Sequence, residues 1–367
     1  MTDPALTPEQ LESSRDLIDA FRRELAKLFV GQDTLVDGVL TAITAGGHVL
    51  VESLPGLGKT LLVKAVGKIL GLRTNRIQFT PDLMPSDITG SHVFDLAERK
   101  FVFHPGPVFT QFLLADEFNR APAKTHAALL EVMQERQVTL DGRHHPLAPP
   151  FLVLATQNPI ENEGTYNLPE AQLDRFLFKL SMGYPEAAEE ERIYGLFLSG
   201  ESPERILDRD VQAVADAARV YQLQQTASRV TVDASIISYI AALVRRTRGY
   251  PGLHLGASPR AGIAMVTAGR ALALARGRAF VVPDDIADVA LPALRHRVIL
   301  NPEAEIEGRT ADGILGEMIK QIEVPKGSVV PLPAADARPG ASRAGGPLSV
   351  VGKPGICLLY TSPSPRD

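Results

Sequence analysis

The chain has 367 residues, of which 45% are hydrophobic, so it is long enough to fill the cores of two domains. Its formal net charge of -5 excludes a global positive field of the kind that attracts nucleic acids, while leaving room for a local basic groove. The single cysteine, Cys357, lies in the C-terminal tail, which excludes disulfide bonds within the chain and cysteine-based zinc sites.

Nothing in the sequence indicates a membrane protein. No apolar run approaches the roughly 18 residues that are needed to span a bilayer. The N-terminal stretch MTDPALTPEQ is polar and acidic, unlike a signal peptide. We therefore expect a soluble, cytoplasmic protein with no membrane span.

Two helices are predicted ahead of the first strand. The first has Thr7 as its N-cap and Pro8 at its first helical position, and Gln10 three residues after the cap closes a capping box. The second covers VGQDTLVDGVLTAITAG, residues 30–46, and leads directly into the first strand.

A glycine-rich turn follows that strand, within ESLPGLGKTLLV at residues 52–63. A strand, a glycine turn and a helix that opens on Lys59 and Thr60 form the layout of a phosphate-binding loop, because backbone N–H groups and the helix N-terminus attract phosphate. Lys59 would reach the outer phosphates, and the Thr60 hydroxyl would hold Mg²⁺. The usual motif has glycine where this chain has Ser53. The alternative is a structural glycine turn between a strand and a helix.

From this turn to about residue 184, short strands alternate with helical stretches. The candidate strands are HVLVE (48–52), RIQFT (76–80), FLLADE (112–117) and FLVLAT (151–156). All but the second are nearly continuous apolar runs, as expected for parallel strands buried on both faces. The pattern predicts an open α/β sheet whose ligand binds at the carboxyl ends of the strands.

Polar side chains follow two of these strands. Asp116 would hold Mg²⁺ directly or through water, and Glu117 would act as a base or orient the attacking water. Asn158, at the end of the neighbouring strand, could hydrogen-bond the γ-phosphate or the attacking water. The alternatives are that the two acids merely end a strand in solvent and that Asn158 is an ordinary polar strand end before Pro159.

Two arginines extend this set. Arg175, in LPEAQLDRFLFKL, could reach the nucleotide of a neighbouring subunit and neutralise charge on the transferring phosphoryl group. The alternative is a surface arginine paired with Asp174. Arg260, in GASPRAGIAMV, opens a helix of the second half and could contact the γ-phosphate if that half closes over the nucleotide. Its alternative is plain solvent exposure at a helix start.

Helical periodicity dominates the second half of the chain. The predicted helices lie in EAAEEERIYGLFL, DRDVQAVADAARVYQL, DASIISYIAALVRRTRG, SPRAGIAMVTAGRALALARG and VPDDIADVALPALRHRV. We therefore expect residues 1–185 to form an N-terminal helix and an α/β nucleotide-binding core, and residues 186–324 to form an all-helical domain. Residues 325–367 are rich in Pro, Ala, Gly and Ser and predict a disordered tail. The terminal CLLYTSPSPRD resembles a translated sequencing adapter, an assembly artefact.

The ordered motifs LPGLGKT, LLADEFNRAPAKTHAALLEVMQERQVTLDG, LATQNPIENEGTYNLPEAQLDRF and GASPRA resemble the AAA+ ATPases, and within them the MoxR family. The resemblance covers about residues 10–324 and implies a P-loop NTPase core, with a parallel sheet flanked by helices, plus an all-helical lid. It implies that Asp116 and Glu117 are Walker B residues, Asn158 is sensor 1, Arg175 is the arginine finger and Arg260 is sensor 2.

The resemblance also implies the nucleotide contacts. Its Walker A loop and the VGQ segment beside the adenine pocket assign cofactor binding to Gly31, Gln32, Pro55, Gly56, Leu57, Gly58, Lys59, Thr60 and Leu61. Mg²⁺ would be held by Thr60 and Asp116, so the implied cofactors are ATP and Mg²⁺. Ser53 departs from the AAA+ pattern and would alter the geometry of the loop without removing its phosphate contacts.

Two further segments resemble the helix-2-insert clade of these ATPases. GSHVFDLAERKFVFHPGPVF, residues 90–109, would form two short strands around a turn. QVTLDGRHHPLAPP, residues 137–150, would form a hairpin with Asp141-Gly142 as its turn. In related machines such loops project towards the pore or a partner. His144 and His145 are interpreted as surface histidines rather than metal ligands, because no third ligand is apparent.

The resemblance implies Mg²⁺-dependent ATP hydrolysis in a homo-oligomeric ring, expected to be a hexamer because Arg175 would need a neighbour's site. It also suggests a chaperone-like role in maturing or activating client proteins, often with a partner that carries a von Willebrand factor A domain. The alternatives are a magnesium-chelatase-like ATPase subunit, a DNA-remodelling ATPase and a non-hydrolysing nucleotide-gated scaffold. The acidic net charge argues against nucleic acid as a partner, while Glu117 and Arg175 argue against the scaffold.

Overall fold

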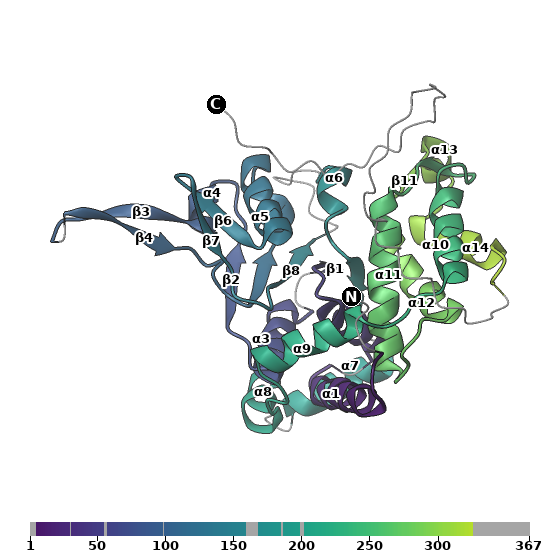
Figure 1. Ribbon diagram of the computed structural model, residues 1–367, viewed down its shortest axis with the longest axis horizontal. Helices are drawn as coiled ribbons and strands as arrows, with labels where there is room; N and C mark the ends of the chain where they lie inside the picture. Colours follow the sequence, from purple (N-terminus) through teal and green to yellow (C-terminus); the bar gives the residue numbers. More distant parts are fainter. Residues whose placement is uncertain are drawn as a thin grey trace, which may run out of the picture. The chain divides into compact units, whose positions relative to one another are not determined.

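A five-stranded parallel sheet lies at the centre of the first half of the chain (Figure 1). The computed structural model describes residues 5–29, 31–54, 57–97, 99–158, 168–184, 186–198 and 202–325. The strands, in spatial order, are β2 (Thr74–Gln78), β5 (Phe112–Asp116), β8 (Leu152–Gln157), β1 (Val49–Ser53) and β9 (Phe178–Met182). The predicted α/β class and its four strands are therefore confirmed.

Strand β9 is the element of this sheet that the sequence did not predict. It lies at one edge, paired with β1 alone, and its buried residues alternate with the partly exposed Lys179 and the exposed Ser181. A strand of this kind lacks the continuous apolar run that marks the central strands. The other edge strand, β2, is likewise the predicted strand with the fewest apolar residues.

Helices cover both faces of the sheet, and successive residues of each strand face opposite sides. Val49 and Val51 pack in one apolar cluster with the first three helices, whereas Leu50 packs in a second cluster with α5. The helices of this half are α1 (Pro8–Ala26), α2 (Asp33–Ala45), α3 (Lys59–Leu70), α4 (Pro85–Thr89), η1 (Phe118–Arg120), α5 (Ala123–Glu135) and α6 (Glu170–Leu173). The capping box predicted at Thr7 and Gln10 is present.

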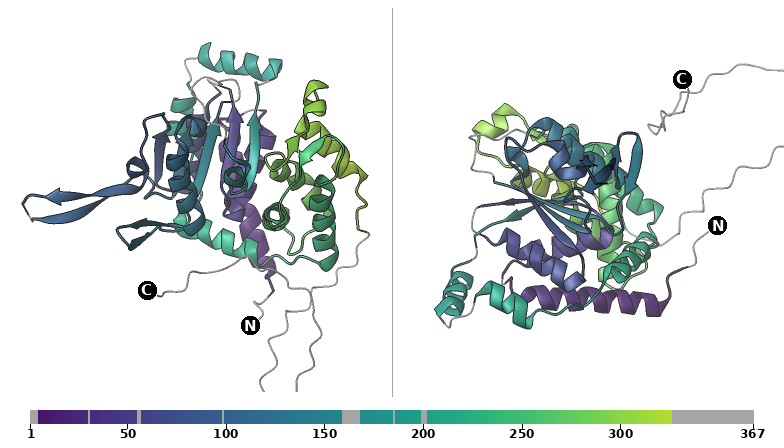
Figure 2. Two further views of the ribbon diagram at one scale, coloured as in Figure 1. Left: turned by 90° about the horizontal axis from the view of Figure 1, so that it is seen from above. Right: turned by 90° about the vertical axis from the view of Figure 1, so that its left-hand side faces the viewer.

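Two antiparallel hairpins extend from the same side of the core (Figure 1; left-hand view of Figure 2). They consist of β3 (Gly90–Asp95) with β4 (Lys100–Pro105), and of β6 (Gln137–Leu140) with β7 (Arg143–Pro146), and both confirm the prediction. The second turns at Asp141 and Gly142, whose φ angles of 49° and 73° are those of a tight hairpin turn. In it, the His144 Nδ1 lies 3.1 Å from the Thr139 hydroxyl, and His145 stacks on Phe103 of β4 at 4.3 Å.

The second half of the described chain is mainly helical, with one short antiparallel pair, β10 (Leu253–Leu255) with β11 (Ile299–Leu300), and an isolated β-bridge between Thr231 and Phe280. Its helices are α7 (Ala187–Leu198), α8 (Pro203–Asp210), α9 (Ala217–Ser228), α10 (Ala234–Thr247), α11 (Pro259–Ala275), α12 (Pro283–Leu294), α13 (Pro302–Ile306) and α14 (Ala311–Gln321). None of the helices in the described part of the chain combines the length and the apolar character that crossing a lipid bilayer requires. The predicted tail, with Cys357, lies outside the described residues.

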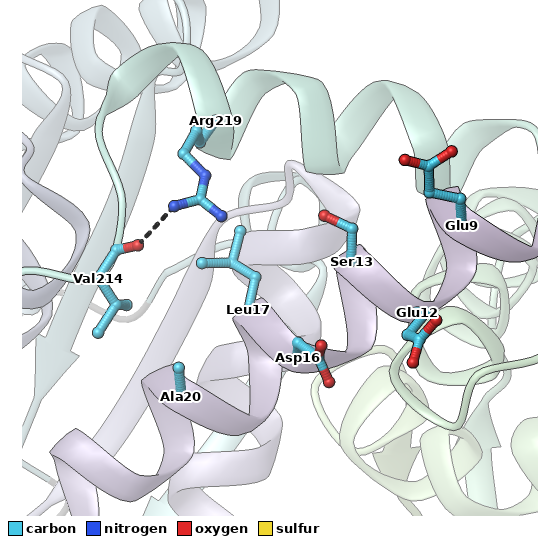
Figure 3. A pocket seen from close by; sticks show the side chains of 8 residues that line it. All are labelled: Glu9, Glu12, Ser13, Asp16, Leu17, Ala20, Val214 and Arg219. Atoms are coloured by element: carbon cyan, nitrogen blue, oxygen red, sulfur yellow. Dashed lines mark hydrogen bonds between the residues drawn. The ribbon is translucent and has the colours of Figure 1, made fainter.

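One helix predicted from periodicity, over residues 208–223, is wrong, because residues 211–216 interrupt it and separate α8 from α9. The interruption is held by contacts distant in sequence: the Val214 N–H donates to the Ile69 carbonyl at the end of α3, at 2.8 Å. Asp216 then caps α9, and the Arg219 guanidinium donates back to the Val214 carbonyl at 3.2 Å (Figure 3). The tertiary hydrogen bond to Ile69, together with the local cap, overrides the helical periodicity of this segment.

Candidate nucleotide-binding site

The candidate site lies at the carboxyl edge of the sheet, where three neighbouring strands end together. Strand β8 is paired on one side with β5, through Ala155 and Ala115, and on the other with β1, through Gln157 and Glu52. Because the strands are parallel, the residues that follow β5 and β8 and the turn that follows β1 meet at the same edge. The sheet therefore brings the predicted Asp116, Glu117 and Asn158 to the edge that carries the glycine turn.

The glycine turn leads straight into α3. Gly58 is the N-cap of this helix and has a φ of 84°, a left-handed conformation that favours glycine. Lys59 is the first helical residue, and its Nζ donates to the Ser53 carbonyl at 3.3 Å, which folds the side chain back over the turn. Leu57, Thr60 and Leu61 are half-buried. The predicted residues Pro55 and Gly56 lie outside the described residues.

Ser53, the departure from the usual motif, is the last residue of β1. It is paired with Met182 of β9, its side chain is buried, and its hydroxyl donates to the Leu54 carbonyl at 3.0 Å. Among the described residues it is not one of those with positive φ. The backbone at this position is therefore open to any residue small enough to be buried beside β9.

Thr156 organises the two acids. Its hydroxyl donates to Asp116 Oδ1 at 2.6 Å and accepts the backbone N–H of Glu117 at 3.0 Å. Thr156 is fully buried and Asp116 is 6% exposed, so these hydrogen bonds are shielded from water. Glu117 has a φ of 54°, which is uncommon outside glycine and turns the chain sharply away from the strand.

Each acid also has an arginine partner. Arg76 of β2 makes an ion pair of 2.7 Å with Asp116 Oδ2, and Arg120 of η1 makes one of 3.0 Å with Glu117 Oε2. The Glu117 side chain remains 29% exposed, so water can reach it. The candidate site thus combines two carboxylates, each paired with one arginine.

Asn158 follows β8 directly and is buried. Beside it, Gln157 donates to Glu52 Oε1 at 2.9 Å, and Glu52 also pairs with Lys179 of β9 at 3.0 Å. This second polar group links the carboxyl ends of β8 and β1 to Lys179, the second residue of β9.

Gly31 and Gln32 lie against the start of α7. The Gln32 side chain donates to the Gly183 carbonyl at 3.4 Å. Gly31 has a φ of 74°, and a Cβ at this position would lie 1.4 Å from the Glu189 carboxylate. The left-handed conformation favours glycine here, and a side chain would also have to displace the Glu189 carboxylate.

The two predicted arginines lie on elements that are connected to each other. Arg175 is half-buried, and its Nε has no hydrogen-bond partner within the described ranges. The alternative pairing with Asp174 is disfavoured, because the Asp174 oxygens contact Arg297 at 2.6 Å and the Ser258 hydroxyl at 2.8 Å. Arg260 is exposed at the start of α11, two residues after that serine.

Three arginines in this arrangement were missed by the sequence analysis: Arg76, Arg120 and Arg297. Arg76 lies among exposed residues of the edge strand β2, so its local sequence gave no signal of its pairing with Asp116. Arg120 follows the acids by three residues, a spacing typical of a local ion pair. Besides a local hydrogen bond to the Ala293 carbonyl, Arg297 contacts residues 174–177 through the tertiary fold, and no local spacing points to that pairing.

The donor set at this edge fits Mg²⁺. A carboxylate at Asp116 and a hydroxyl at Thr60 are oxygen ligands, and Mg²⁺ typically takes one or two such groups together with substrate phosphates and water. Within the described ranges no cluster of three or more His, Cys, Asp or Glu side chains is arranged to hold a metal ion.

Comparison with known proteins places this geometry in a class. Residues 48–178 match the ATPase family associated with various cellular activities (AAA), and residues 245–318 match the AAA lid domain. The crystal structure of a candidate ATPase from Cytophaga hutchinsonii superposes with a TM-score of 0.78 and 40% identity, over 87% of this chain and 98% of that one. The fold and the site therefore define an AAA ATPase core with its lid.

Two relatives narrow the assignment. Chaperone MoxR1 of Mycobacterium tuberculosis is 42% identical over 84% of this chain and 82% of its own length. The uncharacterized protein YeaC of Bacillus subtilis is 44% identical over 86% of this chain and 97% of its own length. The chain belongs to the MoxR family of AAA+ ATPases.

Proposed function

We propose that this chain is a Mg²⁺-dependent ATPase that assembles into a ring and uses ATP hydrolysis to remodel, mature or activate client proteins. The observation that carries the proposal is the common position of Lys59, Asp116, Glu117 and Asn158 at the carboxyl edge of one sheet. The similarity to a named chaperone supports protein clients.

The turn between β1 and α3 would bind the phosphates of ATP. Gly58 frees backbone N–H groups, and the first turn of α3 adds the positive end of the helix dipole. Lys59 would leave the Ser53 carbonyl and reach the outer phosphates, and Pro55, Gly56, Leu57 and Leu61 would add further contacts to the nucleotide. Gly31 and Gln32 would lie beside the adenine.

Thr60 and Asp116 would hold Mg²⁺. The ion, when bound, neutralises charge on the β- and γ-phosphates. Thr156 fixes the Asp116 carboxylate by accepting one backbone N–H and donating to one carboxylate oxygen. Since Arg76 is half-exposed, its ion pair with the other oxygen can exchange for a different cation.

Glu117 would orient the attacking water and accept its proton. The left-handed turn at Glu117 directs its side chain away from the buried strand, and the bond to Thr156 holds its backbone in place. Asn158 at the adjoining strand end would contact the γ-phosphate or the same water. Proton transfer of this kind contributes about 10²- to 10⁴-fold to the rate.

Arg175 and Arg260 would contact the nucleotides of two different subunits. Arg175 would act on the ATP of a neighbour, as an arginine finger worth about 10³- to 10⁵-fold in rate. Arg260 would contact the γ-phosphate in its own subunit as the lid closes. A shared site of this kind requires a ring, and we propose a homo-hexamer.

The useful output would be a change in the angle between the core, residues 1–185, and the lid, residues 186–324. The two projecting hairpins are the surfaces that would pass this change to a client or to a partner with a von Willebrand factor A domain. A chain with these elements needs neither a membrane nor a nucleic acid as its partner, and we place its work in the cytoplasm.

The test is a mixing experiment on steady-state ATPase activity. Glu117→Gln and Arg175→Ala should each lose at least about 10²-fold in rate, because the first removes the base and the second the neighbour's charge. Mixing the two variants should restore part of the activity, since some sites then combine an intact Glu117 with an intact neighbouring Arg175. Wild-type activity per subunit should rise with protein concentration.

Matched surface substitutions provide the controls. Glu131→Gln and Arg23→Ala change exposed residues of the same types and should leave the rate unchanged. Full activity of Arg175→Ala at every concentration would exclude the shared site. Absence of any nucleotide hydrolysis by the wild type would favour a nucleotide-gated scaffold, and strong stimulation by DNA would favour a DNA-remodelling ATPase over the protein-directed function.

A further inference from the structure

The residues that follow α12 hold the core segment that carries Arg175. Arg295, His296 and Arg297 each contact a backbone carbonyl of residues 174–179. His296 Nε2 donates to the Phe176 carbonyl at 3.1 Å, and Arg295 donates to the Lys179 carbonyl at 3.4 Å. Three consecutive residues of the lid are therefore bonded to one short stretch of the core.

Arg297 makes the most extensive of these contacts. Its guanidinium donates to the Asp174 carboxylate at 2.6 Å, and to the carbonyls of Asp174, Phe176 and Leu177 at 3.0, 2.7 and 3.3 Å. The side chain is 3% exposed, and the Asp174 side chain is 13% exposed. Arg175 thus lies between two residues whose backbone positions are fixed by one buried arginine.

The charge of Arg260, the predicted sensor 2, acts on Arg297. Burial lowers the pKa of Arg297, Asp174 raises it, and the charge of Arg260 lowers it further. Arg260 is therefore close enough for its charge to be felt at Arg297. A change in what Arg260 faces, such as the arrival of a phosphate, alters the electrostatic balance of the pair formed by Arg297 and Asp174.

Asp174 has a second connection, to the start of α11. Its Oδ2 accepts the hydroxyl of Ser258 at 2.8 Å, and that same hydroxyl accepts the backbone N–H of Arg260 at 3.1 Å. One carboxylate therefore joins the residue before Arg175 to the helix that begins with Arg260. We call Asp174, Ser258 and Arg297 the Asp174 hub.

We propose that the Asp174 hub is a relay that makes the position of Arg175 depend on the lid of its own subunit, so that nucleotide bound in one subunit sets the activity of the next. The relay rests on the proposed function, in which Arg175 acts on a neighbour. Asp174, Ser258 and Arg297 are positioning residues. Helices α11 and α12 pack against each other, so a lid movement that displaces them also displaces the bonded segment 174–179.

Ser258→Ala is the sharpest test, because the chain offers a matched control. Ser202 also caps a helix, with a proline as the next residue, and its hydroxyl accepts a backbone N–H three residues on. Ser258→Ala and Ser202→Ala lose the same kind of cap, but only the first breaks a bond to Asp174. Ser202→Ala should keep wild-type ATPase activity, while Ser258→Ala and Asp174→Asn should lose about 3- to 30-fold.

Mixing Ser258→Ala with an excess of Glu117→Gln shows whether Ser258→Ala impairs its own active site or the Arg175 that it supplies to a neighbour. Subunits of Ser258→Ala retain their own Glu117, and an adjacent Glu117→Gln subunit supplies an Arg175 held by an intact hub. Activity per Ser258→Ala subunit should therefore return to at least half of the wild-type value. A merely structural defect in the Ser258→Ala subunit would persist in the mixture.

Two outcomes would overturn the relay: wild-type activity of both Ser258→Ala and Asp174→Asn, or a loss that excess Glu117→Gln does not repair. Failure of the proposed function is distinguishable, because it shows in the Arg175→Ala variant. If Arg175→Ala is fully active, or is not rescued by Glu117→Gln, the shared site is wrong whatever the hub variants do. If Arg175→Ala is rescued and the hub variants behave as wild type, only the relay is wrong.

Discussion

Two aspartate–arginine pairs in this molecule have nearly the same length and very different surroundings. Asp116 pairs with Arg76 at 2.7 Å and Asp174 with Arg297 at 2.6 Å, but the arginine side chains are 51% and 3% exposed. An exposed pair is exchanged readily for water or another cation, whereas a buried pair is costly to break because one charge is left without a partner. The Asp116–Arg76 pair, at the carboxyl edge of the sheet, can therefore exchange its partners. The Asp174–Arg297 pair, at the contact between lid and core that we call the lid junction, is expected to stay intact.

The largest expected difference lies in stability. Arg297→Ala should lower the free energy of unfolding by about 3–5 kcal/mol, because it removes a buried guanidinium that is the partner of the Asp174 carboxylate and of three backbone carbonyls. Arg76→Ala removes an arginine from a pair of the same length and should cost less than about 1 kcal/mol. Urea denaturation of both variants tests the contrast, and equal losses would show that exposure does not distinguish the two pairs.

Thr156→Val tests the hydrogen bonds that hold Asp116 and Glu117 at the carboxyl edge of the sheet. The Asp116 oxygen and the Glu117 N–H would lose their common partner, which should cost about 1–3 kcal/mol and also lower the ATPase rate. Thr125→Val is the matched control, since that buried hydroxyl donates to the Leu83 carbonyl at 2.6 Å. We expect it to cost similar stability with little change in rate. Thr156→Ser, which keeps the hydroxyl, should remain active.

At the amino edge of the sheet, the buried His48 makes the stability of the protein depend on pH. His48 is buried there, with Nδ1 accepting the Val153 N–H at 3.0 Å and Nε2 donating to the Met133 carbonyl at 3.1 Å. Burial lowers its pKa to about 4, so the folded protein holds His48 neutral while the unfolded chain takes up a proton below about pH 6.5. Stability is therefore full above that pH and falls as the pH drops towards 4.

At pH 5 the loss from His48 alone should be about 2 kcal/mol relative to neutral pH. Melting temperatures measured from pH 7.5 to 4.5 check this. His48→Gln keeps a donor and an acceptor without a titrating group, so its curve should be flatter. The exposed His254→Gln should follow the wild type, and a His48→Gln curve as steep as the wild type would contradict the assignment.

The smallest expected effect is that of Ser53→Gly. Because Ser53 has no positive φ and is the last residue of β1, glycine relieves no strain and should cost about 0.5–1 kcal/mol in stability. The KM for ATP should change less than about two-fold. A large gain in affinity would show that the serine constrains the phosphate loop.

The carboxyl edge could be predicted from sequence because strand topology brings it together. Asp116, Glu117 and Asn158 each follow an apolar strand, and parallel strands place their ends side by side. The two hairpins were also predictable, since the Asp141-Gly142 turn and the strands flanking residues 96–99 are local signals. The roles assigned to these residues in binding and hydrolysis stay predictions until activity is measured.

The lid junction could not be predicted in the same way. Arg297 contacts residues that lie 120 to 123 positions earlier, and nothing in the periodicity of α12 says where that helix docks. The break between α8 and α9 has the same cause, since it depends on Ile69. The boundary at residue 185 also stays a prediction, because the apolar cluster that contains Val51 of β1 continues to Met265 of α11.

The hairpins carry one further consequence, for how force would travel. Besides the stack of His145 on Phe103, His92 of the first hairpin lies 2.8 Å from the Asp141 carboxylate at the tip of the second. Helix α5 leads from the turn after Glu117 to the base of the second hairpin, a rod about 20 Å long. These contacts join the two hairpins, and α5 connects the second hairpin to the segment that follows Asp116 and Glu117. A small tilt of α5 would therefore move both hairpins together.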